Sequence, residues 1–157
     1  MRPTALRSAI GALAALVALA AACSPAPADP VQAALDELKA AAEARDAERF
    51  ADRLAPAFQG PHGLGRPEAI AQLKRYFAAY ERVAIEVYGV ESERDGDSAR
   101  VRCVVELSGQ ARRAFGLEGL LPPSVGYRFE LDLADEGGVW RVRGASWEPA
   151  EARGMGP

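Results

Sequence analysis

The spacing of apolar residues changes along the chain, from a helical period in the first half to strict alternation from Val83 onward. Before that point, apolar side chains recur every three or four residues, as in a helix with one buried face. Beyond it, apolar and polar side chains alternate, as in strands with one covered face. Helices followed by such strands predict an α+β fold, in which the helices cover one face of an antiparallel sheet.

Two helices are expected in the first part of this pattern. The first begins at Asp29-Pro30, because Asp29 can accept hydrogen bonds from free amides and Pro30 suits the first turn, while Gln32 stands at the capping-box position. The second begins after Asp46, which is another N-cap candidate, and Pro56 is expected to end it.

A loop rich in glycine and proline separates these two helices from a third. The loop is expected to contain a short strand at Phe58-Gln59, and the third helix starts at Pro67. The apolar face of this helix is expected to consist of Ile70, Leu73, Phe77 and Tyr80.

Turns divide the alternating half into strands. The sequence RDGD at positions 94–97 predicts a tight hairpin, because Asp-Gly readily takes the positive φ values of such a turn. A longer connection is expected from Ser108 to Ser124, and DEGG at positions 135–138 predicts the next turn. The last strand then carries Trp140 on its apolar side and ends near Trp147.

Three segments together resemble the nuclear transport factor 2-like (SnoaL-like, cystatin-related) domains of bacteria: LKAAAEARDAERFADRLAPAFQG, GRPEAIAQLKRYF and GVWRVRGASWEP. The resemblance covers residues 31–149 of the chain. It implies a cone, in which a curved sheet wraps the N-terminal helices and leaves a pocket at the open end. Members of the family include isomerases, dehydratases, binding subunits and domains without known activity, so the fold alone implies no function.

Enzymes of this family are expected to hold a carboxylate or histidine inside the cone, usually with a tyrosine or a second acid. The positions expected on the concave face include no acid, base or histidine: Ile85, Val87, Val101, Cys103, Val105, Tyr127, Phe129, Leu131, Trp140 and Val142. The charges fall on the alternate face, at Glu86, Arg102, Glu106, Arg128, Glu130, Asp132, Arg141 and Arg143. We therefore expect a non-catalytic binding module for a small apolar ligand or a protein partner, without a cofactor or metal.

Two alternatives stay open at this point. One is an isomerase-like or dehydratase-like enzyme that uses His62 and a tyrosine in the cone pocket. The other is a homodimeric assembly subunit, for which the resemblance suggests the sheet face as the interface. The apolar centre of that interface would be formed by Tyr88, Val90 and Val104.

Six residues are candidates for the pocket or its mouth: His62, Tyr76, Tyr80, Tyr127, Trp140 and Phe115. His62, the single histidine, is a general base or ligand contact in one interpretation and an exposed loop residue in the other. The tyrosines either offer hydroxyls to a ligand or pack in the core. Residues 111–124, which contain Phe115, either fold over the end of the cone or form a lid or partner surface.

Composition fits a single globular domain with an extension. The 157 residues are 49% hydrophobic and 26% charged. Residues 1–22 contain Arg2, Arg7 and no acids, so a chain that starts at Cys23 has 17 basic and 22 acidic side chains, a formal charge of −5. This acidic balance argues against nucleic acid as a partner.

The N-terminus has the pattern of a secretory signal. A basic start precedes the uncharged run Ala9–Ala22, whose 14 residues fall short of the ~20 that a spanning helix needs. The alanines at 20–22 before Cys23 resemble a bacterial lipobox, which implies a diacylglycerol on the cysteine sulfur. The alternative is ordinary signal cleavage, either at this bond or after Ala26-Pro27-Ala28.

The expected organisation is a signal peptide over 1–22, a lipid-anchored linker over 23–29, the domain over 30–150 and a disordered tail over 151–157. The lipid would attach the protein to the membrane of the bacterial cell envelope, facing the periplasm, and Ser24 in place of aspartate favours the outer membrane. Cys103 is expected to be a buried thiol, without an intramolecular partner if Cys23 is acylated.

Replacement of Cys23 by alanine should leave the precursor without lipid. Mass spectrometry of the membrane-extracted mature protein should find acyl chains on Cys23 in the native sequence and none in Cys23→Ala. An unmodified Cys23 in that extract would contradict the lipoprotein prediction.

Overall fold

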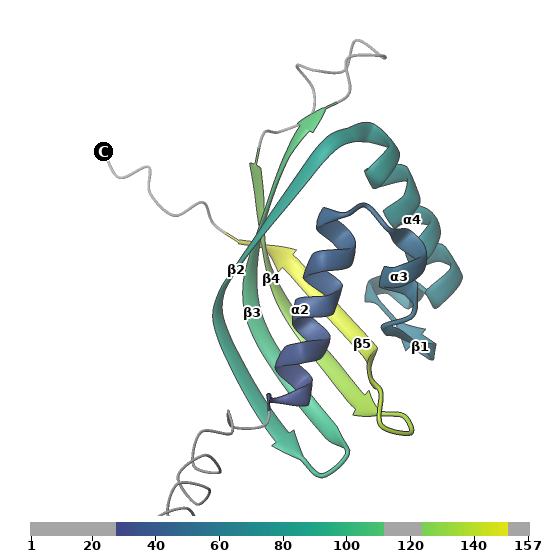
Figure 1. Ribbon diagram of the computed structural model, residues 1–157, viewed down its shortest axis with the longest axis vertical. Coiled ribbons are helices and arrows are strands. Elements are labelled where there is room, and N and C mark those ends of the chain that lie inside the picture. Colours follow the sequence, from purple (N-terminus) through teal and green to yellow (C-terminus); the bar gives the residue numbers. More distant parts are fainter. Residues whose placement is uncertain (1–27, 112–123, 151–157) are drawn as a thin grey trace, which may run out of the picture.

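A curved sheet wraps two long helices and a short one in the computed structural model, which describes residues 28–111 and 124–150 (Figure 1). The sheet has five strands in the order β1-β5-β4-β3-β2. The predicted α+β architecture is therefore confirmed. The elements are α2 Pro30–Glu43, α3 Ala47–Ala51, β1 Leu54–Gln59, the 3-10 turn η2 Pro61–Gly63, α4 Arg66–Ala79, β2 Tyr80–Asp95, β3 Ser98–Ala111, β4 Ser124–Asp135 and β5 Trp140–Pro149.

The helix starts follow the capping residues that the sequence indicated. The Asp29 side chain accepts a hydrogen bond from the Val31 amide at 3.0 Å, and the Asp46 side chain accepts one from the Arg49 amide at 3.0 Å. Each bond satisfies an amide that has no partner within its helix. Gln32 instead donates its side-chain amide to Asp36, one turn along the helix.

The prediction that the second helix runs up to Pro56 is wrong. Helix α3 ends at Ala51, and strand β1 begins at Leu54 and includes Pro56. Proline cannot donate a ladder hydrogen bond, but β1 is an edge strand that pairs only with β5, so the missing donor costs little. Leu54 and Phe58 of this strand are buried in the core.

The boundary between α4 and β2 also differs from the prediction. Tyr80 is the first residue of β2 rather than the last residue on the helix face, and β3 extends into the predicted loop as far as Ala111. The two extensions depend on each other, because the added part of β2 pairs with the added part of β3, for instance Arg82 with Gln110. Pairing with a distant segment decides the end of this helix.

Strands β2 to β5 form an antiparallel meander whose curvature comes from irregular pairing. The predicted hairpin is present, with Gly96 at φ +56° in the turn between β2 and β3. The β2–β3 register shifts between Tyr88 and Glu91, around Gly89 at φ +58°. The β4–β5 register shifts between Asp132 and Leu133. Such bulges bend a sheet and increase its twist.

The two faces of the sheet divide as the alternation predicted. The inner face packs on the helices and contains the core, with Val101, Leu133 and Val142 at most 2% exposed. The outer face carries cross-strand ion pairs that are open to solvent, at distances of 3.1, 3.2 and 2.7 Å: Arg100–Asp132, Arg102–Glu130 and Arg128–Glu148. Exposed pairs contribute little to stability, but they keep this face polar. Among the described helices, none is long and apolar enough to cross a membrane.

Replacement of Gly109 by alanine should lower the free energy of unfolding by about 1–3 kcal/mol, as overpacking does. A Cβ at this position would overlap the ring of buried Tyr80 and lie 3.0 Å from the Arg82 carbonyl oxygen. Urea unfolding followed by circular dichroism measures the change.

Gly126→Ala is the matched control on β4, because its Cβ would meet nothing closer than Ala150 at 3.5 Å. This variant should stay within about 0.5 kcal/mol of the native chain. Equal stability of Gly109→Ala and Gly126→Ala would show that the Tyr80 ring does not need a glycine beneath it.

Candidate functional site

An apolar cavity of about 460 Å³ lies between the inner face of the sheet and the helices α2 and α4. Figure 1 shows both helices on the same side of the curved sheet. The helices contribute Leu35, Leu38, Lys39, Ala42, Ala69, Ile70, Gln72, Leu73, Tyr76 and Phe77 to the described lining. The strands contribute Leu54, Phe58, Val83, Ile85, Val87, Cys103, Val105, Leu107, Phe129, Leu131, Val142, Ala145 and Trp147, while Phe50 and Leu64 complete it.

Two sequence patterns produce this lining. Alternate residues of each strand point to the same face, so the inner face presents one apolar row per strand. Residues three or four apart on α2 and α4 form the facing rows. Several of the facing side chains are small, among them Ala42, Ala69 and Ala145, so the two layers leave space between them.

Polar groups are few on the described lining of the cavity. Lys39 is one of them, and its ammonium group forms an ion pair with Glu43 Oε1 at 2.9 Å. Gln72 is exposed. Tyr76 is half-buried, and burial raises the pKa of its phenol to about 12, with the nearby Tyr80 and Tyr127 phenols adding to the rise. None of the described lining residues is a carboxylate or a histidine.

Exposed lining residues mark where the cavity meets solvent. Val87 on β2 is 36% exposed and Trp147 on β5 is 37% exposed. The Trp147 ring packs on Phe129, with their centroids 5.7 Å apart.

Of the residues predicted for the pocket or its mouth, Tyr76 is the one that lines this cavity. His62 is exposed on η2, with φ +57°, and contributes to neither hollow described for this fold. Tyr80 is buried in the core beside α4, and Phe115 lies outside the described residues.

Tyr127 and Trp140 belong to the inner face of the sheet but do not line the cavity. Tyr127 is half-buried and packs edge-on against Phe129, at a centroid distance of 6.3 Å. Trp140 is buried, and the Arg94 guanidinium lies 4.9 Å from the centre of its ring. Both residues support the wall of the cavity from outside.

Seven of the ten positions predicted on the concave face do line the cavity: Ile85, Val87, Cys103, Val105, Phe129, Leu131 and Val142. The contribution of α2 and α4 was missed, apart from Tyr76. The apolar residues of both helices do follow helical spacing in the sequence. Such spacing indicates a buried face, but it does not distinguish a filled core from the wall of a cavity.

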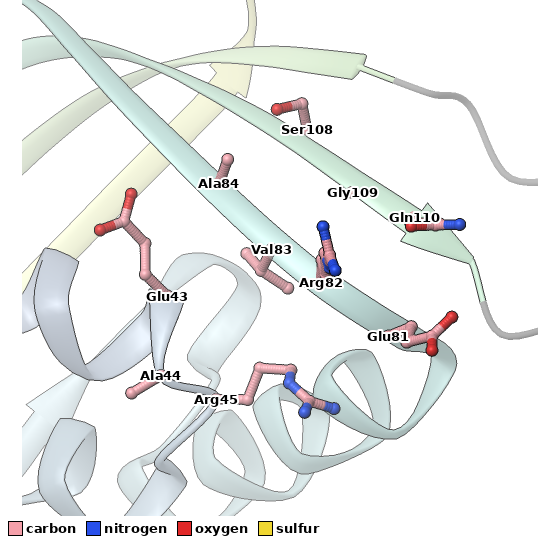
Figure 2. A pocket seen from close by; sticks show the side chains of 10 residues that line it. All are labelled: Glu43, Ala44, Arg45, Glu81, Arg82, Val83, Ala84, Ser108, Gly109 and Gln110. Atoms are coloured by element: carbon pink, nitrogen blue, oxygen red, sulfur yellow. The ribbon is translucent and has the colours of Figure 1, made fainter.

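A second hollow, an open groove, lies at the start of β2, between the end of α2 and the end of β3 (Figure 2). Figure 2 shows Glu43 and Arg45, at the end of α2, on one side of the strand, and Ser108 and Gln110 of β3 on the other. The charged groups of α2 here already have partners. Glu43 accepts hydrogen bonds from Lys39 and from the Ile85 amide, and the first of these lowers its pKa most. Arg45 Nη1 donates to the Tyr80 carbonyl at 3.1 Å.

These bonds give the groove a structural role. Strand β2 is the last strand of the sheet, so its outer backbone groups have no strand partner. Glu43, the last residue of α2, and Arg45, just beyond it, satisfy two of those groups, which holds the edge strand against the helix. No cluster of three potential metal ligands occurs among the residues that the structure describes.

No protein-family model matches the chain, and no curated protein matches it. Solved structures do match. A candidate dehydratase of the NTF2-like family from Streptomyces avermitilis is 20% identical, with a TM-score of 0.64 over 78% of this chain and 95% of that one. An NTF2-like protein from Cytophaga hutchinsonii is 16% identical, with a TM-score of 0.63 over 80% of this chain and 100% of that one.

A third similar structure is Bd1075 from Bdellovibrio bacteriovorus, 12% identical, with a TM-score of 0.64 over 76% of this chain. The chain spans 40% of the length of Bd1075. The chain has the nuclear transport factor 2-like fold. Because all these identities are low and this fold serves unrelated functions, a function must be argued from the cavity.

The Cys103 thiol should react slowly with a charged reagent such as dithionitrobenzoate while the chain is folded, and rapidly in denaturant. The residue is 5% exposed and burial raises the pKa of the thiol, so little reactive thiolate is available. Arg102→Cys in a Cys103→Ala background is the control, because Arg102 is exposed on the same strand. Equal rates for Cys103 in the folded and unfolded chain would contradict its burial.

Proposed function

We propose that this protein binds a small apolar ligand in the cavity between the sheet and α2 and α4, without catalysis. The observation that carries the proposal is the cavity itself, about 460 Å³ with an almost entirely apolar described lining. Ligand sites are typically concave, mainly apolar and about 300–1,000 Å³ in volume. Burial of apolar surface would supply the binding energy, at roughly 25 cal/mol per Å² before the cost of association is subtracted.

The character of the lining supports binding over proton-transfer chemistry. A general base must lie within about 3 Å of the proton that it removes, or reach it through one water. Within the described lining there is no carboxylate or imidazole to do so, and His62 lies outside it. The Streptomyces avermitilis protein is described as a candidate dehydratase, but that activity is not transferred to this chain.

We also propose that Cys23 anchors the chain to the membrane of a bacterial envelope. The support is the sequence pattern of a short apolar run that ends in small residues before the cysteine. Six residues, Ser24 to Asp29, separate the anchor from α2, and in the extended polyproline II conformation they would span about 19 Å. Such a tether would hold the cavity close to the membrane surface, where sparingly soluble apolar molecules collect.

Filling the cavity should abolish ligand uptake while the fold survives. N-phenyl-1-naphthylamine, a neutral apolar dye that fluoresces when it leaves water, should bind the native chain saturably. Val105→Trp places a large side chain into the lining and should weaken dye binding by about tenfold or more, which is about 1.4 kcal/mol. Fluorescence titration gives both affinities.

Val104→Trp is the matched control, one residue away on the same strand. Val104 pairs with Tyr88 and Arg128 on the outer face, so the new ring lies outside the cavity and dye affinity should not change. Circular dichroism checks that both variants fold. Equal dye affinity in the native chain and a folded Val105→Trp would refute binding in this cavity.

A further inference from the structure

One tyrosine of the described cavity lining, Tyr76, has a hydroxyl without a partner among the described residues. No described residue makes a hydrogen bond with the Tyr76 hydroxyl, although Tyr76 lines the cavity. At the same time, no side-chain nitrogen or oxygen of a described, non-exposed residue is buried without a partner. The Tyr76 hydroxyl therefore opens onto accessible space. It offers one donor to whatever occupies the cavity.

Two aromatic rings pack against the Tyr76 ring and limit its movement. The Tyr76 ring lies 4.6 Å from the Tyr80 ring, centroid to centroid, and 6.3 Å from the Phe77 ring. Tyr80 is itself buried against Gly109, where a larger residue would not fit. A donor held in this way loses little conformational freedom when a ligand binds.

The surroundings of Tyr76 are electrically neutral. Lys39 is the one charged side chain of the described lining, and Glu43 neutralises it at 2.9 Å. The Tyr76 phenol is neutral near pH 7 to 8, and burial raises its pKa further, to about 12. A carboxylate in this apolar space would lose its hydration without meeting a free positive charge, which is costly.

We propose that the ligand is an uncharged molecule with an apolar body and one hydrogen-bond-accepting oxygen, such as a ketone, ester or alcohol, which accepts a bond from the Tyr76 hydroxyl. This inference rests on the proposed function and names the chemical class of the ligand. Tyr76 acts as the polar anchor, and the aliphatic and aromatic lining holds the body of the ligand.

A series of ten-carbon compounds tests the anchor: 2-decanone, n-decane and decanoate, each measured at pH 8 by displacement of N-phenyl-1-naphthylamine. Tyr76→Phe should weaken 2-decanone about three- to tenfold, the effect of one hydrogen bond, and leave decane unchanged. Decanoate should bind the native chain at least about tenfold more weakly than 2-decanone. Tyr127→Phe is the control, because Tyr127 lies near Tyr76 but outside the lining.

The possible failures are distinguishable. If neither the dye nor any compound of the series binds, the proposed function fails and the anchor fails with it. If decane binds and Tyr76→Phe weakens decane and 2-decanone equally, or affects neither, only the anchor is refuted. Two other results would also overturn the assignment to Tyr76. One is that decanoate binds as tightly as 2-decanone. The other is that the preference for the ketone is lost in Tyr127→Phe instead of in Tyr76→Phe.

Discussion

The structure depends on one constraint: a curved, long-stranded sheet presents more apolar inner surface than its helices can fill. Strands β2, β3 and β4 have 16, 14 and 12 residues, and bulges bend them around two helices of 14 residues. Burial of both apolar faces drives the layers together. Small side chains at several facing positions prevent complete filling, so the same packing that stabilises the domain leaves a cavity in its middle.

The contacts that hold the edge of the sheet also shape the cavity. Glu43 binds the Ile85 amide of the edge strand, and in doing so it stands where it can neutralise Lys39. Tyr80 fills the space above Gly109, and its ring supports Tyr76. Stability and the proposed ligand selectivity are therefore coupled: a change that loosens the first residues of β2 would also disturb the charge balance of the described lining and the position of the Tyr76 hydroxyl.

Local signals in the sequence predicted most of the fold. Strand alternation separated the inner from the outer face, and Asp29 and Asp46 marked the helix starts. The errors arose where distant pairing decides the outcome. Pro56 lies in a strand that pairs with β5 and tolerates proline because it is at an edge, and Tyr80 follows the helical spacing but pairs with β3. The cavity could not be predicted in this way, because periodicity identifies a buried face but not the distance between two such faces.

The most direct test of a preformed apolar cavity is a crystal structure of the chain under xenon pressure. Xenon occupies dry apolar cavities without needing a polar contact. We predict xenon atoms between α4 and the sheet, among Leu73, Phe77 and Val105. Side chains that fill this space, with no xenon between these residues, would contradict the central claim that the domain is built around an open binding cavity.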